Sequence, residues 1–421
     1  MKIGIAGPIS TESVATLLGD ATPALKGASG APLLGTLIRI FLERGHSVSA
    51  YTMDASLRID EQEPKVAQSG RFRIYYIPVR RRAFRYQDGH FGRMSDFLSM
   101  ERRLLVRVMR EDRPDIVHAH WAYEFALAAI DSGLPYLVTA HDSPWHVVRY
   151  TPSVYRICRY LLAKVVVSRA TSMSAVSPFV ARELERWRSK PIPVIANPAP
   201  LDLEGGVGIP RERVSGRDVK VIMVLNGWVR YKNPEPAFKG FRLIRKQFPG
   251  ASLHVYGWGY GDGERAFQWT TARGCADGVV FHGAVPYERI LAAMRGADIL
   301  LHPALLESCC MTIVEAMRLG LPVIGGQFSG GVPWQLDGGK AGMLVDVTSP
   351  EDIAAAIRLL TTDDATYAEI SRFAIARSQE LFASSAVASA YESAYLKVLS
   401  GAGAAVSTDL GSVAIHRHEK R

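Results

Sequence analysis

The chain has 421 residues, a length that predicts two or three domains rather than one. Apolar residues make up 48% and charged residues 22%, a composition that excludes wholesale disorder and indicates a buried core. Apolar runs of about 18 residues are absent, and the start MKIGIAGPIS is too short and too broken by Gly and Pro for a signal peptide, so we expect a cytoplasmic protein without a membrane span. The 4 cysteines form no CxxC pair, which argues against a disulfide framework and against a zinc site.

Positive charge is concentrated in the first half of the chain. Residues 1–200 hold 27 Lys and Arg against 18 Asp and Glu, whereas residues 201–421 hold 23 of each. The segment Arg71–Arg113 alone has 12 arginines, no lysine and 5 acids. It includes Met94–Arg110, a pattern typical of a helix with an apolar face made of Phe97, Met100, Leu104 and Val108.

Two interpretations of this Arg-rich segment stay open. In the first, the helix packs on the core and its arginines are simply solvated. In the second, Arg71–Arg113 makes a peripheral contact with anionic lipid headgroups at the inner face of the membrane, or with an anionic acceptor. Nucleic acid is not expected as a partner, because the aromatic residues of a base-stacking platform are sparse in this segment.

Short apolar runs alternate with helical patterns along the first half. The expected elements, in chain order, are the strand Lys2–Ala6, the helix Leu34–Arg44, and the strands Ser47–Thr52, Asp115–His120 and Pro135–Ala140. This βαβ rhythm predicts a parallel sheet. A polar, proline-broken stretch around Asn197–Arg217 then interrupts the periodicity and marks a domain boundary.

A second series of the same kind follows the boundary. Its expected strands are Val219–Leu225, Ala251–Tyr256, Gly278–His282, Asp298–His302 and Pro322–Gly325, and its expected helices are Ala237–Phe248, Tyr287–Arg295 and Met311–Leu319. The chain therefore reads as an α/β protein with two doubly wound domains. Because ligands of open α/β sheets bind outside the carboxyl ends of the strands, we expect the active site in the cleft between the domains.

The expected organisation has five parts. They are a first domain over residues 1–200, a linker over 201–217, a second domain over 218–378, a C-terminal helix over 379–400 that packs back on the first domain, and a tail over 401–421. The tail is rich in small residues and has little to bury, so we expect it to be disordered.

The segment Asp298–Gly320 is a strand followed by a loop and a helix. Glu307 falls in the loop and Glu315 one turn inside the helix, so a ligand on the helix N-terminus could meet both carboxylates. Free backbone N–H groups near Met311 and Thr312 would receive an anion. Two solvated carboxylates are the alternative that the spacing alone leaves open.

A second strand, loop and helix lie at Val221–Phe241. Asn233 reads as the N-cap of the helix and Pro234 as its first residue. Arg230 and Lys232 stand just before this N-terminus, where two cations beside exposed N–H groups make a site for a diphosphate. On this segment alone, two solvated loop cations are an equal alternative.

These motifs resemble the retaining glycosyltransferases of family 4, which have two Rossmann-like domains that face each other across a cleft, the GT-B architecture. The resemblance covers most of the chain and is strongest at ESCCMTIVEAMRLGLPVIGG, which is similar to the family's E-x7-E element. It is supported by NGWVRYKN, VVFHGAVP, SGGVPWQLDGGKAGMLVD, GASGAPLLGTLIRIFLERGHSVSAYT, DIVHAHW and VTAHD.

The resemblance implies an enzyme that moves a sugar, in the manner of a hexosyltransferase, from a nucleotide-sugar donor to a hydroxyl of a glycan, polysaccharide or lipid-linked acceptor. It places the acceptor side in the first domain and the nucleotide sugar in the second. It implies no metal ion and no other cofactor, and it suggests polysaccharide biosynthesis at the cell envelope as the setting.

Residue roles follow from the resemblance for the second domain. Glu315 would accept hydrogen bonds from the ribose hydroxyls, Glu307 would touch the donor sugar, and Lys232 would neutralise the diphosphate leaving group. The backbone near Val285 would meet the base. The family's Gly-Arg pair is Gly227-Trp228 here, so Arg230 is the candidate for the second cation at the diphosphate.

In the first domain, the resemblance implies that His141 contacts the transferred sugar and that Gly30 lets the backbone approach the phosphates. Glu307, His141 and Lys232 are thus the expected catalytic residues. A metal site at His118, His120 and His141 is a remote alternative, since no additional ligand at metal spacing is evident.

Two other functions stay open. A degenerate member of the family could be a non-catalytic scaffold that binds a nucleotide sugar or a glycan. A sugar-nucleotide epimerase could use the same architecture. A dehydrogenase is not expected, because G-x-G-x-x-G does not follow Lys2–Ala6, although Asp54 closes the second strand where such a domain would hold its ribose.

Overall fold

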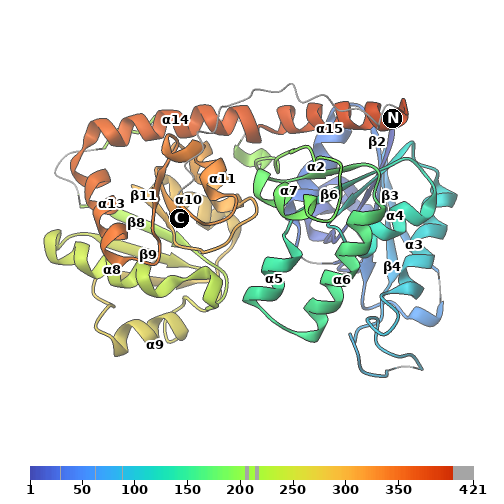
Figure 1. Ribbon diagram of the computed structural model, residues 1–421, viewed down its shortest axis with the longest axis horizontal. Helices are drawn as coiled ribbons and strands as arrows, with labels where there is room; N and C mark the ends of the chain where they lie inside the picture. Colours follow the sequence, from blue (N-terminus) through green and yellow to red (C-terminus); the bar gives the residue numbers. More distant parts are fainter. Residues whose placement is uncertain (29, 62, 88, 204–207, 214–217, 402–421) are drawn as a thin grey trace.

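Two α/β domains lie side by side in the computed structural model, with a long helical pair along one side of both (Figure 1). The structure describes residues 1–401 except 29, 62, 88, 204–207 and 214–217. The expected tail therefore lies outside the described residues from position 402 on, as do parts of the expected linker. In the described part of the chain, no helix has both the length and the apolar character needed to cross a membrane.

The first sheet has seven strands in the order β3-β4-β2-β1-β5-β6-β7. They are β1 (Lys2–Ala6), β2 (Ser47–Asp54), β3 (Lys65–Ser69), β4 (Phe72–Pro78), β5 (Ile116–His120), β6 (Tyr136–Ala140) and β7 (Met173–Ala175). Neighbouring strands are parallel except for the edge pair β3–β4, which is antiparallel. The central strands are buried almost throughout, as the near-continuous apolar runs of a doubly covered parallel sheet require.

The second sheet has six strands in the order β10-β9-β8-β11-β12-β13, and all of its pairs are parallel. They are β8 (Lys220–Val224), β9 (Ser252–Tyr256), β10 (Val279–Gly283), β11 (Ile299–His302), β12 (Val323–Gly326) and β13 (Met343–Val345). The strand order reverses between β8 and β11. Ligands of open α/β sheets bind at such a switch point, outside the carboxyl ends of the strands.

Helices cover both faces of each sheet. In the first domain they are α1 (Ala15–Leu18), α2 (Pro32–Glu43), α3 (Ser99–Asp112), α4 (Glu124–Ser132), α5 (Pro144–Tyr150), α6 (Val154–Arg169) and α7 (Pro178–Glu185). The second domain has α8 (Pro234–Gln247), α9 (Arg265–Ala272), α10 (Tyr287–Arg295), α11 (Met311–Arg318), α12 (Val332–Gln335), α13 (Pro350–Thr362) and α14 (Asp364–Phe382), and α15 (Ser384–Leu399) ends the described chain.

The helix expected at Met94–Arg110 begins later than its apolar pattern predicts. Phe97 and Leu98 adopt left-handed backbone conformations with φ of 52° and 57°, so α3 starts at Ser99. Within the helix, Leu104 and Val108 are buried in the core of the first domain, as expected for its apolar face.

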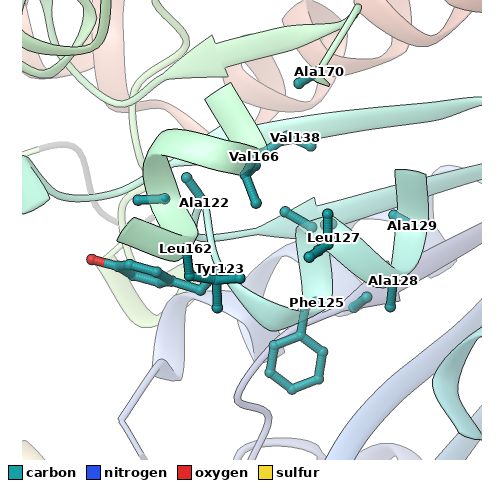
Figure 2. Packing of buried hydrophobic residues seen from close by; sticks show 14 of the residues in the cluster. Ala122, Tyr123, Phe125, Leu127, Ala128, Ala129, Val138, Leu162, Val166 and Ala170 are labelled. Atoms are coloured by element: carbon teal, nitrogen blue, oxygen red, sulfur yellow. The ribbon is translucent and has the colours of Figure 1, made fainter. Parts of the chain in front are cut away.

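That core fills the space between the sheet and helices α4 and α6. Ala122, Phe125 and Leu127 pack beside Leu162 and Val166 in this cluster (Figure 2). Apolar side chains of α4 and α6, large and small, cover this face of the sheet, and this packing fixes where the loops after β5 and β6 emerge.

The last helix returns to the first domain. Helix α15 packs against α2 and β6, and its residues Tyr391 and Tyr395 are buried among the side chains of that domain. The hydroxyl of Tyr395 lies 2.7 Å from Nδ1 of His118. At the rim, Arg44 pairs with Glu392 at 2.6 Å. Helix α15 is therefore part of the first domain's packing.

Candidate active site between the domains

The loops that follow the strands of both sheets meet between the domains. The ring of Tyr150, on α5 after β6, lies 6.1 Å from the ring of Tyr231, in the 3-10 turn Arg230–Lys232 after β8. Gly330, after β12, lies so close to Phe179 on α7 that an added Cβ would be 3.3 Å from that ring. The carboxyl ends of the two sheets thus face each other.

Glu307 lies in the loop between β11 and α11, and its backbone packs against the backbone of Gly330 and Gly331. The N–H of Gly331 donates to the carbonyl of Glu307 at 2.7 Å. Gly330 has φ of 62°, and a Cβ there would lie 2.4 Å from the Glu307 carbonyl oxygen, so only glycine permits this close approach. At the end of the loop, Gln335 bonds both the N–H and the carbonyl of Cys310.

The side chain of Glu307 is bound to two cationic groups. Nζ of Lys232 lies 2.6 Å from its Oε1, and Nε2 of His302 lies 3.2 Å from the same atom. Burial acts to raise the pKa of Glu307, but the hydrogen bonds and charges of His302 and Lys232 outweigh burial and lower the pKa to about 2. The structure therefore brings together two of the residues expected at the site, Lys232 and Glu307.

His302 and Cys310 extend this cluster. Sγ of Cys310 lies 3.5 Å from Nε2 of His302, and both side chains are buried. Burial lowers the pKa of His302, whereas Cys310 and Glu307 raise it, with a net increase to about 9. Analysis of the sequence missed both residues, although His302 ends an expected strand.

His302, Glu307 and Cys310 also have ligand atoms that lie within 4.8 Å of one another, close enough to meet at one metal ion. In the structure, Oε1 of Glu307 accepts from the Lys232 ammonium group and contacts Nε2 of His302. Glu307 therefore pairs with Lys232 and His302, and Cys310 contacts His302.

Glu315 lies on α11, directly behind the helix N-terminus. Its side chain is 7% exposed, and its Oε1 accepts a hydrogen bond of 3.1 Å from the hydroxyl of Tyr287. Burial raises the pKa of Glu315 to about 7, and the Tyr287 hydrogen bond opposes this only in part. The N–H groups of Met311 and Thr312 belong to the first turn, where a helix offers them no internal acceptor.

Val285 stands in the short loop between β10 and α10, two residues before Tyr287. Since Tyr287 contacts Glu315, the expected base site and the expected ribose site are adjacent in the fold. Trp334, whose role the sequence does not indicate, packs its ring edge against Phe382 at 6.0 Å.

The loop before α8 differs from its expected form at Asn233. This residue has φ of 51° and its side chain makes no N-cap hydrogen bond; instead Nδ2 donates to the carbonyls of Pro303 and Val347. Asn233 therefore ties the Lys232 turn to the loop after β11, while Pro234 occupies the first helical position as expected. Leu305 adds a backbone bond to Tyr231 at 2.7 Å.

Gly227 has φ of 81°, which favours glycine, and Trp228 beside it packs among Phe238, Tyr260 and Trp269. Trp228 is therefore a packing residue. Arg230 is exposed, and its guanidinium has no hydrogen bond or ion pair to any described residue.

In the first domain, His141 follows β6 and is buried. Its Nε2 lies 2.9 Å from Nδ1 of His120, and its ring stacks on Trp121 at 4.2 Å. Burial lowers the pKa of His141 to about 3, so the ring is neutral near pH 7. His118 has Tyr395 and Thr139 on its two ring nitrogens, which leaves neither nitrogen open for a metal ion.

The glycine-rich loop is held by Asp54. Its carboxylate accepts from the N–H groups of Lys26 at 2.9 Å and Gly27 at 2.7 Å. Asp54 is thus engaged with the loop rather than free for a ribose. Gly30 has φ of 119°, and an added Cβ would meet no atom within 4 Å, so the backbone there is open to an approaching group.

Two family models match the chain in tandem. The model described as Glycosyltransferase Family 4 matches residues 33–203, and the model described as Glycosyl transferases group 1 matches residues 209–377. Together they span about four fifths of the chain.

Two individual relatives are similar to the chain over different shares of its length. A D-inositol 3-phosphate glycosyltransferase of Corynebacterium jeikeium is 32% identical over 151 residues, which cover 34% of this chain and 36% of that relative, so the match spans about a third of its length. The N-acetyl-alpha-D-glucosaminyl L-malate synthase of Bacillus anthracis is 23% identical over 390 residues, covering 88% of this chain and 94% of that protein.

Among solved structures, Anabaena HepE in complex with UDP and glucose is similar in fold. The TM-score is 0.63 at 17% identity, over 93% of this chain and 98% of that one. With two α/β sheets that are parallel apart from the edge pair β3–β4 and whose carboxyl ends face each other, the chain has the GT-B architecture. The chain belongs to the group 1 glycosyltransferases of family 4.

Proposed function

We propose that this glycosyltransferase is a retaining enzyme that transfers a hexose-type sugar from a nucleotide-sugar donor to a hydroxyl of a glycan, polysaccharide or lipid-linked acceptor. The observation that carries the proposal is the cluster at the start of α11. Lys232 and Glu307 lie 2.6 Å apart, and Glu315 lies behind the free N–H groups of Met311 and Thr312. The UDP bound to the similarly folded HepE supports a nucleotide donor.

In this proposal the donor lies across the N-terminus of α11. Glu315 accepts from the ribose hydroxyls, and the backbone near Val285 meets the base. Lys232, the exposed Arg230 and the helix N–H groups stabilise the negative charge that develops on the departing diphosphate, so neither a metal ion nor another cofactor takes part. Gly30 allows the first domain's loop to approach the phosphates.

The sugar itself lies between Glu307 and His141. Glu307 stays ionised, because its pKa is lowered to about 2, and it accepts hydrogen bonds from sugar hydroxyls. His141 is neutral and contacts the sugar from the first domain. The acceptor hydroxyl attacks from the face that the diphosphate leaves, and it gives its proton to the departing phosphate oxygen as the bond between sugar and diphosphate breaks, which preserves the anomeric configuration. Closure of the two domains excludes water from the reaction.

The test is thermal unfolding with a panel of nucleoside diphosphates and nucleotide sugars. A ligand at 100 times its dissociation constant stabilises the fold by roughly 2.7 kcal/mol, so one base should stand out. We expect this stabilisation to be lost in Glu315→Ala. Stabilisation by none of the panel would refute the donor site. Turnover assays with donor alone separate the other two functions: an epimerase converts its donor without an acceptor, and a scaffold binds it without turnover.

The Arg-rich segment supports a further part of the proposal, a peripheral contact with an anionic cytoplasmic membrane surface. A cavity of about 870 Å³ opens on α3 and is lined by Arg102, Arg103, Arg107, Arg110, Arg113 and Asp131. Sedimentation with acidic vesicles at low salt tests this contact. We expect binding that falls with salt and with Arg103→Gln/Arg113→Gln; equal sedimentation with neutral vesicles would contradict it.

A further inference from the structure

A second cavity, of about 330 Å³, lies in the first domain at the carboxyl ends of three neighbouring strands. Its wall comes from Pro8 after β1, from Trp121 and Tyr123 after β5, and from Asp142 after β6. Helix α6 closes the other side. The volume is at the lower end of the range for small-molecule sites.

The wall of this cavity is built from a fixed polar network. The guanidinium of Arg159 lies 3.7 Å above the ring of Tyr123, and its Nη1 lies 2.9 Å from the Glu124 carboxylate. The Tyr123 ring packs in the core beside Leu162, and its hydroxyl points away from that cluster (Figure 2). This hydroxyl donates to Asp142 at 3.0 Å.

Two groups in the cavity keep unused hydrogen-bonding capacity. Asp142 accepts from Tyr123 alone among the described residues, which leaves lone pairs free. The guanidinium of Arg156 has no hydrogen bond or ion pair with any residue that the structure describes. The two groups are close enough for Arg156 to lower the pKa of Asp142, which burial raises.

The Asp142 carboxylate can accept hydrogen bonds and the Arg156 guanidinium can donate them, and the two groups are not bonded to each other. Hydroxyl groups of a ligand can bond to both, because a hydroxyl donates and accepts. An anionic ligand would meet the carboxylates of Asp142 and Glu124, and a cationic ligand would meet two guanidinium groups. Aromatic side chains supply the apolar surface that a sugar ring packs on. The chemistry of the cavity therefore fits a neutral, polyhydroxylated ring.

The cavity also adjoins the site of sugar transfer. Trp121 has φ of 64°, a strained left-handed conformation for a bulky residue, and its indole stacks on His141. His141 and Asp142 are consecutive. A ring in this cavity would lie beside the histidine that contacts the transferred sugar in the proposed function.

We propose that this cavity is the acceptor subsite and that it holds one terminal, uncharged sugar ring, bound through its hydroxyls to Asp142 and Arg156. This inference rests on the proposed function, since it assigns the second substrate of the same reaction. It limits the acceptor to molecules that end in a neutral monosaccharide unit.

The test is saturation-transfer NMR with the methyl glycosides of glucose, galactose, mannose and N-acetylglucosamine, in the presence of the stabilising nucleoside diphosphate. We expect at least one glycoside to bind the wild type, and to bind at least roughly tenfold more weakly to Asp142→Asn and Arg156→Gln. Arg186→Gln, at an exposed arginine after α7, is the matched control and should bind as the wild type does.

Thermal unfolding with the nucleoside diphosphate runs in parallel and reports folding and the donor site of each variant. Equal glycoside binding in both variants, binding of no glycoside by the wild type, or tighter binding of the 6-phosphate of a glycoside would overturn the acceptor subsite. If no nucleoside diphosphate stabilises the wild type against thermal unfolding, the proposed function itself is wrong.

Discussion

Nδ1 of His120 lies 2.9 Å from Nε2 of His141, so the two imidazole rings share one hydrogen bond. Burial lowers the pKa of both, and each ring is neutral near pH 7 with a single N–H group. Nε2 of His120 is buried without a partner in the described part of the chain. Because an orphaned buried N–H is costly, the His120 proton belongs on Nδ1 and is donated to His141. His141 then keeps its own proton on Nδ1.

This assignment predicts the tautomer of His141. Nitrogen-15 NMR of the wild type should show His141 as the Nδ1–H form. His120→Asp replaces the donor by an acceptor and should convert His141 to the Nε2–H form, while the signals of the distant His254 stay unchanged. An Nε2–H tautomer in the wild type would show that the assignment is wrong.

Lys232 should be essential for transfer. Lys232→Ala removes the cation that faces the departing diphosphate, and we expect the transfer rate to fall at least tenfold, about 1.4 kcal/mol in the barrier. It also leaves the largely buried Glu307 side chain, which is 16% exposed, without its closest partner, so the folded state should lose roughly 3–5 kcal/mol. Rates are therefore compared per folded molecule, with the exposed Lys246→Ala as control. An unchanged rate would remove Lys232 from the site.

Opposite pH windows should separate His302 from Glu307. The pKa of His302 is raised from 6.5 to about 9, so its contribution to stability is complete below pH 6.5 and is lost as pH rises to 9. The pKa of Glu307 is lowered from 4.5 to about 2, so its contribution is present above pH 4.5 and is lost as pH falls to 2. Denaturant unfolding of His302→Gln should lack the alkaline loss. If the free energy of unfolding of His302→Gln falls as much as that of the wild type when pH rises from 6.5 to 9, the assignment to His302 is wrong.

Glu315 should make the stability of the fold decrease over another pH range, from about 4.5 to about 7. Its pKa is raised from 4.5 to about 7, so the folded state binds more protons than the unfolded state, and stability falls as pH rises through this range. The full cost above pH 7 is on the order of 3 kcal/mol. Glu315→Gln should abolish this fall. Both Glu315→Gln and Glu315→Ala should weaken nucleotide binding, and transfer by Glu315→Ala should drop at least about tenfold.

The sequence predicts most of the strands, because buried parallel strands such as Ile116–His120 and Val323–Gly326 are short apolar runs bounded by turns. It misses the three-residue edge strands β7 (Met173–Ala175) and β13 (Met343–Val345). It does not reveal the edge hairpin Lys65–Pro78, whose exposed first strand carries Lys and Gln. It also extends the helix at Met94–Arg110 through Leu98, since an apolar pattern carries no sign of left-handed φ.

Site residues on one strand, loop and helix are predictable, because the spacing of Glu307 and Glu315 is local. Partners from other segments are not: nothing near Asn233 in sequence indicates its bonds to Pro303 and Val347. Asp54 likewise reads as a ribose ligand until the fold brings the glycine-rich loop onto it. Such contacts are decided by tertiary packing.

Tyr395 should anchor the last helix to the first domain. Its hydroxyl lies 2.7 Å from Nδ1 of His118, and both groups are buried. Tyr395→Phe keeps the packing but leaves the His118 nitrogen unpaired, so the free energy of unfolding should fall by roughly 1–3 kcal/mol. Ser393→Ala, at an exposed position of the same helix, should change it by less than about 0.5 kcal/mol. Nucleotide stabilisation should persist in both variants, because neither side chain is near α11. If the two substitutions lower the free energy of unfolding equally, the hydrogen bond to His118 contributes nothing to anchoring the helix.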